Sequence, residues 1–181
     1  MKKTIIGAIV GGIIIFIWQF LSWTVLNTHE ATQQYTPNQE AIMAALEANL
    51  PDEGGYYIPG LAPGASEEDM KKIMEESDGK PWASIQYHKA MDMSMGMNMA
   101  RGLITNMVMV WMLCWILLKM SPLNFSNVLI ASIFTGFIVF FNSPYTSSIW
   151  YQWFDIMAHF LDAMVSWIAC GLWLAWWLPR K

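Results

Sequence analysis

Four apolar runs divide the chain, and each is long enough, or nearly so, to cross a membrane. A helix needs roughly 20 residues to cross about 30 Å of hydrocarbon. The runs lie near Ile5–Leu26, Gly102–Leu118, Val128–Phe141 with its flanks, and Phe154–Leu178. The third run is the shortest, so its ends are the least defined. The pattern predicts an all-α fold built as a bundle of four transmembrane helices.

The long polar segment between the first two runs shows weaker patterns. In "TPNQEAIMAALEANLPDEGG" the apolar positions follow helical spacing, and Thr36 is the predicted N-cap. The stretch "SEEDMKKIMEES" predicts an amphipathic helix that Ser66 caps, with Asp69 three residues later. Between them, "PDEGGYYIPGLAPGAS" is rich in Pro and Gly and predicts a loop. Neither Pro nor a turn cluster follows Trp82 until Pro122, so one helix is predicted to run from there into the second span.

These patterns predict three parts of the chain. Residues 1–26 form an N-terminal transmembrane anchor, residues 27–100 form a small cap of helices and loops, and residues 101–181 form a bundle of three transmembrane helices. The segment 27–100 has few apolar residues, and a short chain with little to bury does not build a large core. We therefore expect it to cover the bundle and not to fold as an independent domain.

Composition and charge support a membrane protein and suggest its orientation. The chain is 55% hydrophobic and contains 11 Trp. Residues 27–100 hold 12 of the 14 acidic residues against four lysines, a net charge of −8. The opposite ends of the spans carry basic residues: Lys2, Lys3, Lys119, Arg180 and Lys181. By the positive-inside rule both termini are cytoplasmic and residues 27–100 are extracytoplasmic, in a multi-pass protein of a bacterial inner membrane.

Other features narrow the class further. The N-terminal stretch has a basic start and an apolar centre but lacks a small-x-small cleavage site, so we expect an uncleaved anchor. The two cysteines, Cys114 and Cys170, lie within spans, which excludes a disulfide framework for the cap. The acidic polar segment argues against nucleic acid as a partner.

A methionine occupies every second position of "MDMSMGMNM", just before the second span. Thioethers are soft ligands that suit copper, and His88 could add an imidazole. The candidate metal ligands are His88, Met91, Met95 and Met99. On a helix, however, the five sulfurs fall into two rows that cannot converge on one ion. Since Met also fills irregular gaps at helix junctions, the pattern favours packing over copper or another transition metal.

The last span carries a polar stripe. Asp155, His159, Asp162 and Ser166 fall at i, i+4, i+7 and i+11, which is one helical face. Because a carboxylate in hydrocarbon is costly, this face should meet a partner helix or a wet cavity. The second span brings two more polar residues to the same depth. The predicted intramembrane polar cluster is Arg101, Asn106, Asp155, His159, Asp162 and Ser166.

Three interpretations of the stripe compete. In the first, Arg101 pairs with Asp155 or Asp162 and fixes helix register; the pattern favours this one. In the second, His159 handles protons or helps to bind a ligand. In the third, Asp155, His159 and Asp162 bind zinc, manganese or iron together with ligands from another span or chain. His29 and His88 both lie outside the spans, which argues against a haem held by two transmembrane histidines.

The end of the first span, "WQFLSWTVLNTHE", and the later "LPDEGGYYIPG" resemble a group of bacterial four-helix inner-membrane proteins with no established function. The resemblance covers most of the chain and implies the topology given above. It supplies no active site that could be transferred.

The sequence favours a non-enzymatic accessory or assembly subunit of a larger membrane complex. Gly7 and Gly11 form a GxxxG pair of the kind that lets helices approach closely, and no complete catalytic constellation is evident. The expected partners are membrane lipid and other membrane subunits or further copies of the chain. One alternative is metal (copper) or proton handling at an outer-leaflet polar site. Another is a membrane enzyme that acts on a lipid or lipid-linked substrate, with Asp155, His159 and Asp162 as its acid and base.

Overall fold

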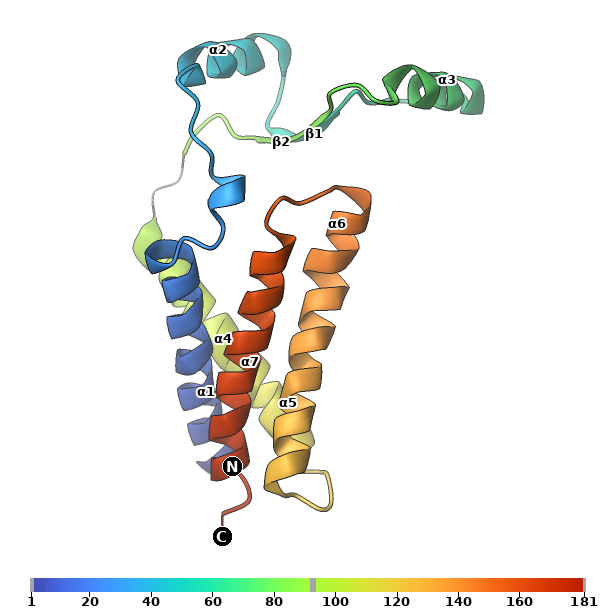
Figure 1. Cartoon of the computed structure of the whole chain (residues 1–181). Coiled ribbons are helices and arrows are strands. Elements are labelled where there is room, and N and C mark those ends of the chain that lie inside the picture. The colour runs from blue at the N-terminus through green and yellow to red at the C-terminus, as the bar shows by residue number, and fades with distance from the viewer. Residues whose placement is uncertain (1, 92–93, 181) are drawn as a thin grey trace. The chain divides into compact units, whose positions relative to one another are not determined.

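The computed structural model describes residues 2–91 and 94–180 and contains four helices long and apolar enough to cross a membrane (Figure 1). They span Lys2–Val25, Met95–Leu117, Phe125–Trp150 and Ile156–Trp177. The predicted bundle of four membrane helices is confirmed, and the chain is a multi-pass integral membrane protein. Both termini lie at one end of this bundle (Figure 1).

The first and third of these segments are not regular α-helices throughout. In the first, α1 (Lys2–Phe20) is extended by a π-helical turn, η1 (Leu21–Val25). The third begins as α5 (Phe125–Phe140), passes through a second π-helical turn, η3 (Phe141–Tyr145), and ends as α6 (Thr146–Trp150). It is therefore longer than the predicted run that ended at Phe141. Pro144 lacks an N–H group and usually breaks a helix, but the wider π-turn accommodates it here.

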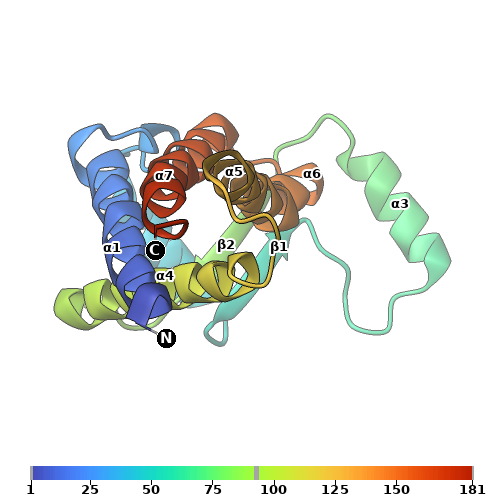
Figure 2. The same cartoon turned by 90° about the horizontal axis from the view of Figure 1, so that it is seen from below.

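The bundle is organised around α7 (Ile156–Trp177), which lies between α1 and α5 (Figure 2). α4 (Met95–Leu117) packs along α1 and barely touches α5. The buried side chains between the helices form one main core cluster. Its members are Ile15, Val110, Leu113, Cys114, Leu117, Val128, Trp167, Cys170, Leu174, Ala175 and Leu178.

Glycines on α1 set the distance between these helices. A Cβ on Gly7 would lie 3.0 Å from Sγ of Cys114, and one on Gly11 would lie 2.7 Å from Val110. A Cβ on Gly12 would lie 2.8 Å from backbone atoms of Met107. The GxxxG pair therefore packs inside this chain, against α4, and leaves no free small-residue face on α1 for a partner at these positions.

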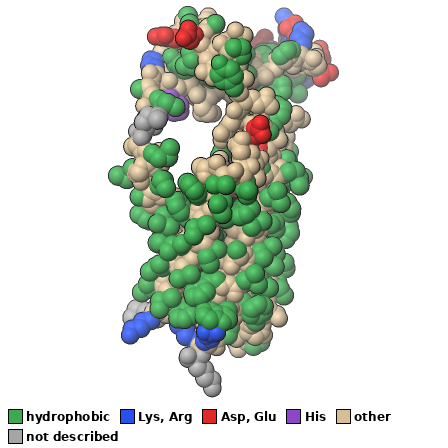
Figure 3. Space-filling model, turned by 60° about the vertical axis from the view of Figure 1, so that its left-hand side comes forward, with side chains coloured by type: hydrophobic (Ala, Val, Ile, Leu, Met, Phe, Trp, Pro, Cys, Tyr) green, Lys and Arg blue, Asp and Glu red, His purple; other side chains and the backbone are tan. Residues whose placement is uncertain are grey.

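The outer surface of the bundle suits hydrocarbon. Hydrophobic side chains cover the visible side of the helices, and basic side chains gather at the end where α1 begins (Figure 3). At that end the Lys3 ammonium donates to the carbonyls of Leu178 and Arg180, and the Trp177 indole donates to the carbonyl of Lys3 at 3.1 Å. These contacts close the bundle between the start of α1 and the end of α7.

Residues 35–93 form a second, smaller compact unit, whereas residues 27–34 and 94–100 group with the bundle. The smaller unit contains α2 (Gln39–Asn49) and α3 (Glu67–Ser77), and its two strands β1 (Gly54–Ile58) and β2 (Ala83–Tyr87) pair antiparallel. Most of its side chains are exposed. Such a small core is what the acidic, apolar-poor composition allows.

The smaller unit confirms one of the local predictions and corrects three. The capping box of Ser66 and Asp69 at the start of α3 is present. The N-cap of α2 is Asn38 and not Thr36, since the helix begins two residues later than predicted. Residues 54–58 are a strand and not a loop, and residues 83–87 pair with them instead of starting a helix. The predicted continuous helix from Trp82 is therefore wrong; α4 begins at Met95.

Candidate functional site

The site is built where the chain turns back after α1. The π-helical turn η1 closes with the N–H of Leu26 donating to the carbonyl of Leu21 at 2.8 Å. Asn27 then adopts a left-handed conformation with φ 47°, which Asn tolerates better than most residues. The hydroxyls of Ser22 and Thr28 share a hydrogen bond of 2.6 Å, with Ser22 fully buried. Together these features fold the next residue, His29, back onto the bundle.

His29 is buried with 0% exposure and lies between two carboxylates of α7 and its N-cap. Its Nδ1 is 2.6 Å from Oδ2 of Asp155, and its Nε2 is 3.0 Å from Oδ2 of Asp162. Thr32 supports this arrangement, because its hydroxyl donates to the His29 carbonyl at 3.0 Å and lies 3.3 Å from the same oxygen of Asp155. Both ring nitrogens of a residue outside the spans thus contact the polar stripe.

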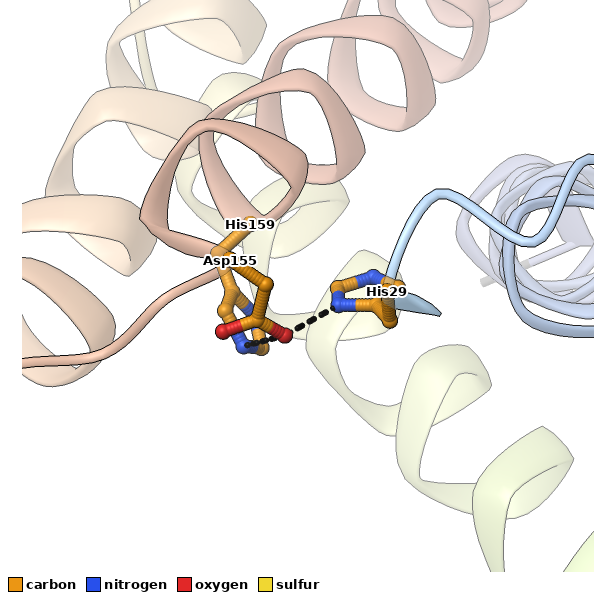
Figure 4. Close-up of side chains that lie close together, drawn as sticks. All are labelled: His29, Asp155 and His159. Carbon is orange, nitrogen blue, oxygen red and sulfur yellow. Dashed lines mark hydrogen bonds and ion pairs between the residues drawn. The ribbon is translucent and has the colours of Figure 1, made fainter. Parts of the chain in front are cut away.

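The stripe itself lies on one face of α7, as its spacing predicts. Asp155 is the N-cap residue, and its side chain makes no capping bond to the helix. This leaves its carboxylate for His29 and for His159, whose Nε2 is 3.4 Å from Oδ2 of Asp155. Figure 4 shows the three side chains converging, with His29 coming from the segment after α1 and the other two from the start of α7. Further along, the Ser166 hydroxyl donates to the backbone carbonyl of Asp162 at 2.5 Å.

Indole rings enclose the site. The Trp18 Nε1–H donates to Oδ1 of Asp162 at 3.0 Å, so α1 also fixes this carboxylate. Trp23 stacks on the His29 ring with 3.8 Å between centroids and 8° between planes. The His159 ring contacts Trp153 at 4.9 Å. These rings limit the positions that both imidazoles can take and keep much of the site from water.

The two carboxylates beside His29 restrict the states that its imidazole can adopt. A neutral imidazole has one N–H group, whereas both nitrogens of His29 face carboxylate oxygens. With both nitrogens protonated, the ring donates to Asp155 and Asp162, and one positive charge lies between two negative charges. With a metal ion on one nitrogen, the other still donates to a carboxylate. Both states satisfy the buried Asp155, which is 5% exposed and would be costly to leave unpaired.

The donor set is also a candidate cation site. Ligand atoms of His29, Asp155 and His159 all lie within 4.8 Å of one another. In a tetrahedral site with bonds of about 2.0–2.1 Å, ligand atoms are roughly 3.3 Å apart. The 3.4 Å between His159 and Asp155 already matches that spacing, and the 2.6 Å between His29 and Asp155 must widen.

The remaining sequence candidates of the polar cluster lie elsewhere. Arg101 is exposed, and among the described residues the ionic partners of Asp155 and Asp162 are histidines, so the suggested pairing with Arg101 is not present. Asn106 is buried, and its amide donates to Oε1 of Gln19 at 2.7 Å. That bond joins α4 to α1 without touching the histidines.

The methionine run does not form one helical site. Met95 and Met99 lie exposed on α4 in the bundle, whereas Met91 and His88 lie exposed in the smaller unit. Met93 and Asp92 fall outside the described residues. His88 and Met91 line a groove of about 430 Å³ in which Met43 also lies. Copper binding by this run stays a prediction.

No known protein family, curated protein or solved structure matches the chain. The resemblance to bacterial four-helix proteins therefore stays a prediction, and the function has to be argued from the geometry of the site.

Sequence reasoning missed two members of the site. His29 was set aside because it lies outside the spans, and Trp18 was not connected with the stripe. One signal was available: two acids on one apolar helix require a cationic or hydrogen-bonding partner. His29 follows the first span by only a few residues, and this places it within reach of the end of the bundle where α7 begins.

Proposed function

We propose that the protein binds one divalent first-row transition-metal ion, with His29, Asp155 and His159 as its ligands. The observation that carries the proposal is the convergence of their ligand atoms within 4.8 Å at the end of a membrane bundle. Two imidazoles and one carboxylate suit Zn²⁺, Fe²⁺ or Mn²⁺, and the set contains none of the thiolate or thioether ligands that Cu(I) prefers.

The surroundings of these ligands support the proposal. Nε2 of His29 lies 3.0 Å from Asp162, so with an ion on Nδ1 this nitrogen would donate to that carboxylate, whose other oxygen accepts from Trp18. A carboxylate that orients a ligating histidine in this way is the usual outer shell of a metal site. Three protein ligands leave a coordination position open, as in catalytic and transport sites and unlike closed structural ones.

Metal titration of the full chain tests the proposal. The purified protein in lipid nanodiscs is stripped with a chelator and titrated with Co²⁺, whose visible absorption reports coordination by nitrogen and oxygen, and then with Zn²⁺ in competition. We expect one equivalent of Co²⁺ per chain, displaced by Zn²⁺, and loss of binding in His159→Ala. If the wild-type protein binds neither ion at micromolar concentrations, the proposal is wrong.

Two further variants separate metal binding from folding. Asp162→Asn keeps the size of the side chain and one oxygen that can accept from Trp18, but it removes the carboxylate that accepts from His29. Affinity should therefore fall about 10–100-fold while the fold is retained. His88→Ala is the matched control, because His88 is the exposed histidine of the other unit. An equal loss of binding in the control would point to adventitious binding by histidines.

The site also has a proposed location. The basic end of the bundle carries Lys2, Lys3 and Arg180, and the acidic residues are concentrated in the segment between α1 and α4. By the positive-inside rule, the termini are cytoplasmic in a bacterial inner membrane, and the histidine cluster faces the extracytoplasmic side.

Cysteine labelling tests this orientation. Ala65→Cys, in the smaller unit, should react with a membrane-impermeant maleimide on intact cells, and Met120→Cys, in the loop after α4, should react only after lysis. The native Cys114 and Cys170 are fully buried and can stay in place. The reverse pattern would place the site on the cytoplasmic side.

Two other roles considered from the sequence have less support. The GxxxG pair that favoured an accessory or assembly subunit has its partner helix within the chain, so that role stays a prediction; co-purification with other subunits would test it. An enzyme acting on a lipid would need the same acids and histidines as catalysts. If cells that carry Asp162→Asn or His159→Ala keep the wild-type phenotype, this would argue against the enzyme role.

A further inference from the structure

A cavity of about 400 Å³ lies inside the bundle beside the histidine cluster. All four membrane segments contribute to its wall, and it reaches Asp162 and His159 at one edge. Its size is typical of pockets for small molecules. The proposed metal ion would lie among its ligand atoms and would not fill the cavity, so the cavity has room for a larger ligand.

One side of the cavity is formed by two helices that contact each other only weakly. α4 lies against α1 and meets α5 only weakly, near the short loop that joins them (Figure 1). Met109 of α4 and Val139 of α5 both line the cavity, and Val139 is 38% exposed. The weak contact between α4 and α5 makes the space between Met109 and Val139 the candidate entrance for a molecule dissolved in the membrane.

The lining residues indicate what kind of head group fits. Among the described residues, neither Lys nor Arg lines the cavity, and the ionisable side chains in its wall are His159 and Asp162. A phosphate head would lie beside the Asp162 carboxylate without a cation to neutralise it. A cationic head would compete with His29, which already donates to that carboxylate. An uncharged polar head avoids both costs.

Hydrogen-bonding groups specify the head further. The Gln19 carbonyl accepts from Asn106, which leaves its NH₂ group to donate to a ligand oxygen. The Ser166 hydroxyl donates to a backbone carbonyl, which leaves its lone pairs to accept. Beside His159 and Asp162, the cavity therefore offers one further donor and one further acceptor, which match a head whose oxygens both accept and donate hydrogen bonds.

We propose that this cavity binds a membrane-soluble molecule with an uncharged, oxygen-bearing head and an apolar chain that leaves between α4 and α5. A hydroquinone and a monoacylglycerol share this chemistry. The inference goes beyond metal binding and does not require a bound ion.

Binding to the full chain in nanodiscs tests the inference, in the presence of a chelator. The probes are decylubiquinol, 1-monolaurin and dodecyl phosphate, and the readout is a saturable rise in the unfolding temperature, since a ligand that binds only the folded state stabilises it. We expect one of the two neutral probes to bind and dodecyl phosphate to bind weakly or not at all. The identity of the bound neutral probe distinguishes a quinone from a glycerolipid source.

Matched substitutions on α5 locate the binding. Val139→Trp fills the opening and should weaken binding about tenfold or more, a cost of roughly 1.4 kcal/mol. Ile138→Trp adds the same indole one residue away, at a position that is 65% exposed and does not line the cavity, and should bind like the wild type. If Val139→Trp does not fold, Ser166→Ala removes the acceptor and should also weaken binding.

Three results would overturn the inference: neither neutral probe binds, dodecyl phosphate binds as tightly as they do, or Val139→Trp binds like the wild type. The same samples, freed of chelator, are titrated with Co²⁺. Val139 is not a metal ligand, so intact metal binding with no probe binding would reject the cavity alone. Probe binding without metal binding would reject only the proposed metal site.

Discussion

Replacement of His29 by Ala should destabilise the protein more than any other single histidine change. The substitution removes a fully buried ring that contacts two carboxylates at 2.6 and 3.0 Å. Removing one partner of a buried ion pair typically costs about 3–5 kcal/mol, because the other charge stays buried without compensation. Thr32 and His159 remain near Asp155, and Trp18 remains on Asp162. We therefore expect the lower end of that range, about 3 kcal/mol.

A double-mutant cycle isolates the contribution of the pair. Asp155→Asn removes one of the two carboxylate charges that His29→Ala leaves without the imidazole, so the double variant should be more stable than the sum of the two single changes predicts. Close pairs of this kind couple by about 0.5–3 kcal/mol. The free energy of unfolding is measured by titration of the metal-free protein from dodecyl maltoside into SDS, with circular dichroism as the readout. His88→Ala, an exposed position, should change it by no more than about 0.5 kcal/mol.

The result that would refute this reasoning is a small effect of His29→Ala. Side-chain hydrogen bonds between membrane helices contribute about 0.6 kcal/mol on average, because the unfolded helices also find partners. A loss of that size, or one equal to that of His88→Ala, would mean that His29 is not the charge partner of Asp155.

Two further predictions concern packing and capping. Gly12→Ala places a Cβ 2.8 Å from the backbone of Met107 and should cost about 1–3 kcal/mol in the same unfolding assay, whereas Gly96→Ala, with nothing within 4 Å, should be neutral or slightly stabilising. Equal effects would mean that α1 and α4 are not in close contact. In α3, the backbone N–H and hydroxyl of Ser66 hold the pKa of Asp69 below its usual 3.8. The stabilisation of α3 by this carboxylate is present above pH 3.8 and is lost as the pH falls through the lowered pKa. Ser66→Ala should therefore reduce the helicity near neutral pH, and its helicity should decrease less in acid than that of the wild type. An acid transition equal to that of the wild type would contradict this prediction.

The sequence predicted the bundle because its signals are local and strong. Twenty consecutive apolar residues have few alternatives to a membrane helix, and the 3.6-residue period placed Asp155, His159 and Asp162 on one face of α7. The same local reasoning failed for β1 and β2. Gly54 and Gly55 have low strand propensity, and their partners lie about thirty residues away in the chain, so no local pattern reports the pairing.

Arg101 and His29 show why a hydropathy argument identifies a polar face more readily than its partner. Depth along the membrane made Arg101 the apparent counter-ion, but depth does not determine which helices are neighbours: α4 packs on α1 and Arg101 is exposed. His29 lies nominally outside its span, and the widened turn η1 and the positive φ of Asn27 bring it back. A desolvated carboxylate pairs with the cationic or hydrogen-bonding group that the chain can bring to it at the lowest cost in free energy. The short loop after the first span is held by the hydrogen bond between Ser22 and Thr28, and it brings His29 to α7. Arg101 has a long side chain, but it lies exposed on α4, which packs against α1. In other small membrane proteins, residues within one turn of a predicted span should therefore be counted as possible ligands of an intramembrane acid.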